Sequence, residues 1–220
     1  MSTTVRPFLR RAHYRLDAKR LIESWGFTVW RTIFTPGTDA TFARALDMIN
    51  RWVEYECFEE FGDTRTSAGA ETQEYRAARE VWKRYSNTII EDRYLDNAPP
   101  ETVGKKLHAW IESRGIGQNS TSRYRFCLVI DQEVLETLDR FPRPPMNDLQ
   151  AKWQLYFVKV IDVEIDGEID HRYPEGYRSC MMAPPWMLAH LYFHGRSLCE
   201  DELRDQYKGI PVYVSAEDGA

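Results

Sequence analysis

The sequence predicts one α+β domain, with a mostly antiparallel sheet covered by helices and a ferredoxin-like arrangement as the candidate topology. Segments rich in β-branched and aromatic residues, such as FTVWRTIF, RYRFCLVID and KWQLYFVKV, alternate with segments of helical periodicity. No internal repeat or low-complexity block divides the chain. We therefore expect an N-terminal arm at 1–24, a single domain at 25–215 and a tail at 216–220.

The first half of the chain predicts two strands and three helices. A strand is expected at 27–34, and the turn residues Thr35, Pro36 and Gly37 end it. Thr38 or Asp39 can cap the helix that follows, whose apolar residues recur at helical spacing: Phe42, Leu46, Ile49, Val53 and Phe58. After a small, polar loop at 62–69, we expect a helix at 70–85, a short strand within 86–95 and a helix at 101–113.

The second half carries the strongest strand signals. A strand at 123–131 becomes continuously apolar, and a short helix at 132–138 and a proline-rich connection at 141–148 follow it. The sheet centre is expected at 153–163. Asp166 and Gly167 form a candidate hairpin turn, and a helix at 186–196 and a last strand or extended tail at 209–216 remain open assignments.

Composition excludes several classes of protein. Hydrophobic residues make up 43% of the 220 residues, which supports a packed core rather than a disordered chain. The net charge of -5 does not favour nucleic-acid binding, and no apolar stretch is long enough to span a membrane. We expect a cytoplasmic protein, with an arginine-rich organellar presequence as the alternative, and four reduced cysteines: Cys57, Cys127, Cys180 and Cys199.

Three segments carry a resemblance to known sequences: GFTVWRTIFTP, IIEDRYLDNAPPETVGKKLHAWI and RYRFCLVID. In these segments the chain resembles a group of filamentous-fungal proteins that have no assigned activity. The resemblance covers about half of the chain in pieces. It implies a fungal source and assigns no catalytic residue.

Arg31 is a candidate site residue because it interrupts a run of large apolar residues. If it faces the interior, it must be paired, and Glu91 or Asp92 is the expected partner. A buried pair of this kind often lines a pocket. The alternation with Trp30 and Thr32 equally permits a position on the solvent face.

His190 and His194 are separated by one helical turn, a spacing that can place two imidazoles on one face for a metal ion. A third ligand would have to come from elsewhere, and Leu191 stands where a zincin would have glutamate. Two partly buried histidines that bond to neighbours explain the same pattern. We therefore predict no metal.

An acidic stretch follows the expected central strand, and it contains Asp162, Glu164, Asp166, Glu168 and Asp170. Its carboxylates could collect a hard cation, but the spacing is not that of an EF-hand loop. A solvated strand face that resists edge-to-edge aggregation is the simpler interpretation.

Aromatic residues could form the walls of a small-molecule cavity, and the chosen candidates are Trp30, Trp153, Tyr156 and Trp186. They could equally belong to the core. Glycine-rich phosphate loops, the GxSxG elbow and the GxGxxG fingerprint are all missing from the sequence, so no cofactor is expected.

The preferred hypothesis is a small-molecule binder or a cofactor-independent tailoring enzyme, with His190, His194 and Arg31 as candidate catalytic residues. A non-catalytic protein-interaction module is the alternative. A metal-dependent enzyme is the third hypothesis. The expected partners are a small-molecule ligand and a second copy of the chain in a homodimer, without nucleic acid or membrane.

Overall fold

The structure is a computed structural model, which describes residues 24–59, 73–115, 122–144, 155–162, 180–194, 205–207 and 210–213. Several expectations lie outside these residues. They are the arm up to residue 23, the loop at 62–69, Trp153, the hairpin turn at Asp166 and Gly167, and the tail at 216–220.

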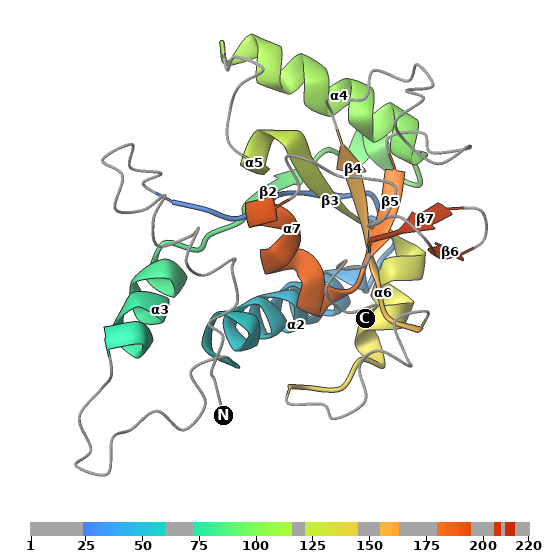
Figure 1. Cartoon of the computed structure of the whole chain (residues 1–220). Helices are drawn as coiled ribbons and strands as arrows, with labels where there is room; N and C mark the ends of the chain where they lie inside the picture. The colour runs from blue at the N-terminus through green and yellow to red at the C-terminus, as the bar shows by residue number, and fades with distance from the viewer. Residues whose placement is uncertain are drawn as a thin grey trace.

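One mixed sheet forms the centre of the described molecule (Figure 1). Its seven strands, counted over the described ranges, have the order β2-β1-β3-β4-β5-β7-β6. β4 occupies the middle position, as expected for the strongest strand signal. The strands are β1 Thr28–Arg31, β2 Thr88–Glu91, β3 Phe126–Ile130, β4 Val158–Asp162, β5 Cys180–Ala183, β6 Asp205–Tyr207 and β7 Ile210–Val212.

The α+β class is confirmed, but the sheet is mixed rather than mostly antiparallel. β1 pairs in parallel with both β2 and β3, and β5 pairs in parallel with β7. The pairs β3–β4, β4–β5 and β6–β7 are antiparallel. Helical crossovers after β1 and β2 return the chain to the same end of the sheet, and this allows parallel neighbours. The strand order therefore does not support a ferredoxin-like topology.

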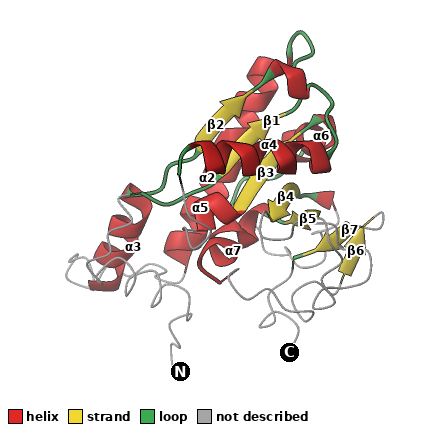
Figure 2. Cartoon of the chain, turned by 90° about the horizontal axis from the view of Figure 1, so that it is seen from above, coloured by secondary structure: helices red, strands yellow, loops and turns green. Residues whose placement is uncertain are grey.

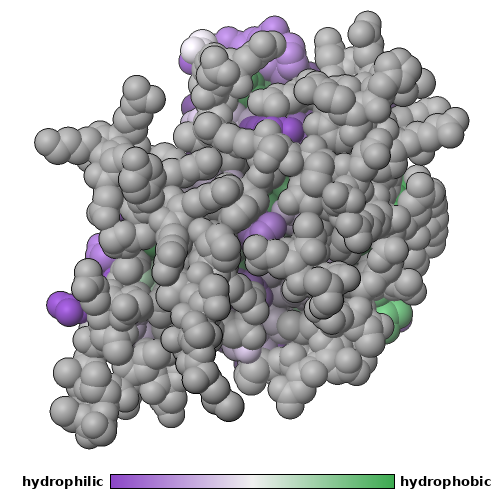
Figure 3. Space-filling view, in the orientation of Figure 1, coloured by the Kyte–Doolittle hydropathy of each residue, from purple (hydrophilic) through white to green (hydrophobic). Residues whose placement is uncertain are grey.

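Helices cover both faces of this sheet (Figures 1 and 2). Helix α4 lies over one face, whereas α2, α6 and α7 lie over the other. The surface over α4, at the top of Figure 3, is mainly hydrophilic. The helices are α2 Thr38–Glu59, α3 Gln73–Lys83, α4 Pro100–Ser113, α5 Ser122–Arg125, α6 Gln132–Asp139 and α7 Leu188–His194, and 3-10 turns occupy η1 Arg93–Leu95 and η3 Pro185–Met187.

Strand β1 shows why two hydrophobic cores form. Successive side chains of a strand point to opposite faces of the sheet. Val29 thus enters the larger core beneath α2 and α7, whereas Trp30 enters the smaller core beneath α4. By the same alternation Arg31 points to the α2 side, where it is buried. The interior face predicted as one alternative for Arg31 is confirmed.

The expected elements differ from the observed ones where tertiary pairing decides the conformation. The sequence does not predict β5 or β6. The CMMA residues of β5 are not β-branched, and this segment forms a strand because it pairs with β4 on one side and β7 on the other. The strand expected at 123–131 begins only at Phe126, after the helical turn α5. β1 is also shorter than expected, since Thr32 and the residues after it leave the β2 register.

The burial of Asp162 contradicts the prediction that the acidic stretch forms a solvated strand face. Its side chain is fully buried and accepts hydrogen bonds from Arg125, the shortest being 2.9 Å from Nη2 to Oδ2. The Arg125 side chain is only 7% exposed. A carboxylate that is fully buried has no access to water, so it requires a buried cation. The other acids of this stretch lie outside the described residues.

No helix among the described residues is long and apolar enough to cross a membrane.

We predict that Gly26→Ala lowers the free energy of unfolding by about 3 kcal/mol or more, from backbone strain together with a clash. Gly26 has φ +132°, and a Cβ added there would lie 2.3 Å from the backbone oxygen of Ser86. Gly115→Ala is the matched control. It also has positive φ but open space around it, so we expect a loss of about 1–2 kcal/mol. Urea unfolding would measure both, and equal losses would contradict the clash.

Candidate functional site

The candidate site lies at the carboxyl ends of two neighbouring parallel strands. Arg31 is the last residue of β1, Glu91 is the last residue of β2, and the two are in register. Helix α2 begins at Thr38, directly after the turn that follows β1. Crevices outside the carboxyl ends of parallel strands are the usual place for ligands in open sheets of this kind.

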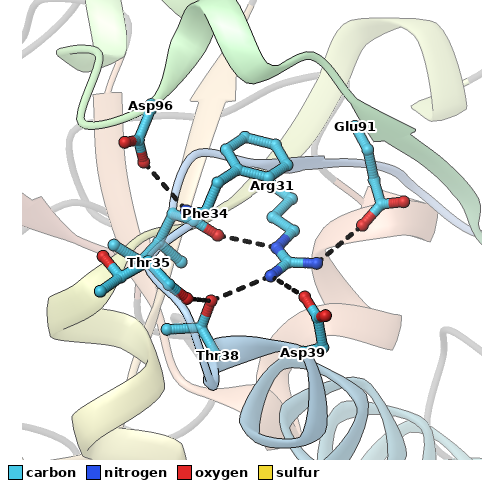
Figure 4. A network of polar contacts seen from close by, with 8 residues as sticks. Arg31, Phe34, Thr35, Thr38, Asp39, Glu91 and Asp96 are labelled. Carbon is cyan, nitrogen blue, oxygen red and sulfur yellow. Dashed lines mark hydrogen bonds and ion pairs between the residues drawn. The ribbon is translucent and has the colours of Figure 1, made fainter.

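The guanidinium of Arg31 connects three segments of the chain (Figure 4). Nε donates to the carbonyl oxygen of Ile33 at 2.7 Å, and Nη1 donates to Glu91 Oε1 at 2.9 Å. Nη2 donates to Thr38 Oγ1 at 2.9 Å and to Asp39 Oδ1 at 2.5 Å. The planar guanidinium fork has five N–H donors and serves four acceptors here, whereas a lysine ammonium has only three N–H donors.

Two phenylalanine rings complete the surroundings of this guanidinium. The Arg31 Cζ lies 4.9 Å from the ring centroid of Phe34 and 4.9 Å from that of Phe42. Both rings therefore stabilise the cation through their negative faces while they keep water away from it. The Arg31 side chain is only 6% exposed, although Asp39 is 89% exposed.

The turn between β1 and α2 holds these groups in place. The Thr38 hydroxyl donates to the carbonyl oxygen of Thr35 at 2.7 Å, so its lone pairs are free to accept from Arg31. Gly37 has φ +88°, a conformation that favours glycine. Asp96 accepts from the backbone N–H of Phe34 at 2.9 Å, which ties the turn to the segment after β2.

These residues surround an open cavity of about 550 Å³, which we call the Arg31 cleft. Its lining consists of Arg31, Phe34, Asp39, Phe42, Glu91 and Arg93. The formal charges of this lining cancel, because two arginines face two carboxylates. Arg93 is exposed, and its Cζ lies 5.6 Å from the Phe34 centroid.

Electrostatics keep Arg31 charged. Burial by itself lowers the pKa of the guanidinium, but the hydrogen bonds and charges of Asp39 and Glu91 outweigh burial and raise the pKa above its ordinary value. The group therefore does not exchange its proton near neutral pH. Its chemistry is that of a fixed cation, which suits ion pairing rather than proton transfer.

A second polar cluster lies on the opposite face of the sheet, at the end of β3. Lys159 Nζ contacts Asp131 Oδ2 at 2.5 Å and Glu133 Oε2 at 2.8 Å. Burial alone would lower the pKa of Lys159. The two carboxylates outweigh burial and raise this pKa above its ordinary value, so Lys159 is charged in its contacts with them. Asp131 also accepts from the backbone N–H of Val134 at 3.0 Å, as the cap of α6. The sequence does not indicate this cluster, because a lysine in an alternating strand is usually read as a solvent-facing residue.

The two candidate metal ligands have different outcomes. His190 Nδ1 lies 2.7 Å from the Tyr213 hydroxyl, which fits the simpler interpretation of a histidine that bonds to a neighbour. The side chain of His194 lies outside the described residues. The described part of the chain contains no group of three or more His, Cys, Asp or Glu side chains that could hold a metal ion.

The proposed aromatic walls do not form one pocket. Trp30 belongs to the core beneath α4, whereas Trp186 belongs to the other core and Tyr156 packs against it. Tyr156 and Trp186 both contact Phe141, with centroids at 4.6 Å and 5.7 Å. The cleft instead uses Phe34 and Phe42. Their position beside Arg31 at the end of the first strand is the signal that could have indicated them.

Three of the four cysteines are described, and all three are free thiols, as expected. Burial raises the pKa of Cys57 and Cys127, and it raises the pKa of Cys180 to about 12. A thiol with such a pKa is a poor nucleophile at neutral pH.

No protein-family model, curated protein or solved structure matches this chain.

We predict that Arg31→Lys lowers the free energy of unfolding by about 2 kcal/mol, because one ammonium cannot serve all the acceptors of the fork. Arg44→Lys is the matched control. Arg44 pairs with Asp139 at 3.0 Å on the surface, with 60% of its side chain exposed, so we expect a change within about 0.5 kcal/mol. Denaturant unfolding would measure both. If Arg31→Lys lowers the free energy of unfolding no more than Arg44→Lys does, the hydrogen bonds of the Arg31 guanidinium do not stabilise the fold.

Proposed function

We propose that this protein binds a small molecule in the Arg31 cleft. The observation that carries the proposal is the cleft itself, which has a volume of about 550 Å³ and aromatic, cationic and anionic groups that converge on it. Ligand sites typically have volumes of roughly 300–1,000 Å³ and combine apolar walls with a few polar groups. The cleft lies at the carboxyl ends of β1 and β2, which is the expected position for such a site.

The network around Arg31 supports a preformed site rather than a flexible one. The guanidinium is fixed by acceptors from the segment after β1, from β2 and from α2, and it fixes Asp39 and Glu91 in return. A ligand that meets groups already in place loses less free energy to the ordering of side chains. The cleft is therefore suited to specific recognition.

Binding is favoured over the interaction-module alternative by the pattern of exposed apolar residues. In the described ranges, the large exposed apolar side chains are Ile89 in β2, Tyr94 in η1, and Leu155, which lies before β4. Exposed apolar residues that occur singly are ordinary surface features. We also propose a filamentous-fungal source and a cytoplasmic location, which are the expectations from the sequence.

We predict that ligands of this cleft depend on Phe34. A small-molecule library with neutral, cationic, anionic and zwitterionic members would be screened by ligand-observed NMR and thermal shift. For its hits, we expect Phe34→Leu to raise the Kd at least tenfold, because leucine lacks the ring face that packs on Arg31 and Arg93.

Tyr94→Leu is the control for this experiment, since Tyr94 is 95% exposed and does not line the cleft. The hits should bind Tyr94→Leu with the same Kd as the unaltered protein. A library without any binder, or hits that respond equally to the two variants, would show that the proposed function is wrong.

A further inference from the structure

The charges in the Arg31 cleft define a ligand class. Asp39 and Glu91 both bond to one guanidinium, through Nη2 and Nη1, so their carboxylates lie close together on the same side of it (Figure 4). Each bonds to Arg31 through one oxygen, Oδ1 or Oε1. The Asp39 side chain is 89% exposed and that of Glu91 is 52% exposed. Each carboxylate can therefore accept another hydrogen bond from a donor in the cleft.

Arg93 provides the opposite charge. Among the described residues, Arg93 contacts the face of Phe34, and no carboxylate pairs with it. Its guanidinium is exposed, so its donors are available to an anion. The Cζ atoms of Arg31 and Arg93 lie 4.9 Å and 5.6 Å from the same centroid, so they are at most the sum of the two, 10.5 Å, apart. A small molecule can span that distance.

A ligand of a single charge would fit this cleft poorly. A simple anion would approach Arg93 but would be repelled by the exposed carboxylates of Asp39 and Glu91. A simple cation would reach those carboxylates but would be repelled by Arg31 and Arg93. A molecule that carries both charges satisfies both sides and leaves no group unpaired.

We propose that the ligand is a zwitterion with a primary ammonium and a carboxylate, as in a free amino acid. The ammonium donates to the free oxygens of Asp39 and Glu91, and the carboxylate accepts from Arg93. The apolar part of the ligand contacts the edges of Phe34 and Phe42, which line the same cavity. This inference rests on the proposed function and names its ligand class.

Four probes of six carbons test the ligand class by titration calorimetry on the full chain. L-norleucine and 6-aminohexanoate carry both charges at different spacings, whereas hexylamine and hexanoate carry one charge each. We expect at least one zwitterion to bind tenfold or more tightly than either singly charged probe. Hexylamine or hexanoate that binds as tightly as both zwitterions would overturn the proposal.

Two variants assign the two charges to their residues. Arg93→Gln should weaken the bound zwitterion about tenfold but should not weaken hexylamine, which loses a repelling charge. Glu91→Gln should weaken the zwitterion but should not weaken hexanoate, for the same reason. The glutamine oxygen can still accept from Arg31, so the fork is retained. Arg114→Gln is the control, because Arg114 also lies over an aromatic ring, at 4.6 Å from the Trp110 centroid, but outside the cleft.

The failure of this inference differs from the failure of the proposed function. If library ligands bind in a Phe34-dependent manner but neither zwitterion binds, the cleft is a binding site for another class of ligand. If Arg93→Gln and Arg114→Gln weaken the zwitterion equally, Arg93 does not hold the carboxylate, and the proposal is overturned.

Discussion

The buried charge of Arg31 is the constraint on which the site depends. A guanidinium that is 6% exposed cannot be left without acceptors, because removing an ion from water costs several kcal/mol. The chain meets this requirement with acceptors from the segment after β1, from β2 and from the start of α2. The fork therefore holds the sheet and the first long helix in a fixed relation, and the cleft forms in the space that these acceptors leave.

The parallel arrangement of β1 and β2 makes this fork possible. Because both strands run in the same direction, their last residues, Arg31 and Glu91, lie side by side. An antiparallel pair would place the end of one strand beside the start of the other. The crossover through α2 and α3 thus serves the site twice, since it sets the direction of β2 and delivers Asp39.

Three ionic groups are buried or half-buried on different parts of the sheet. Arg31 faces α2, Lys159 contacts Asp131 and Glu133 at the end of β3, and Arg125 pairs with the fully buried Asp162. Only the first of these lines the cavity described above. Buried pairs are weak evidence for stability, but each one fixes a particular register, because a shifted strand would leave a charge without its partner.

The sequence by itself determined the helix at Thr38–Glu59 and the central place of β4, because periodicity is a local signal. It left open whether Arg31 faces the interior and whether Glu91 or Asp92 is its partner, and the structure selects Glu91. The sequence could not determine the parallel pairing of β1, the strand β5 or the burial of Asp162, since strand partners far apart in the chain decide these features. The aromatic candidates Trp30, Tyr156 and Trp186 do not gather in one pocket, for the same reason, and Trp153 lies outside the described residues. Composition shows that tryptophans are buried, but only the tertiary structure decides that Phe34 and Phe42, rather than Trp30 or Trp186, face the cleft.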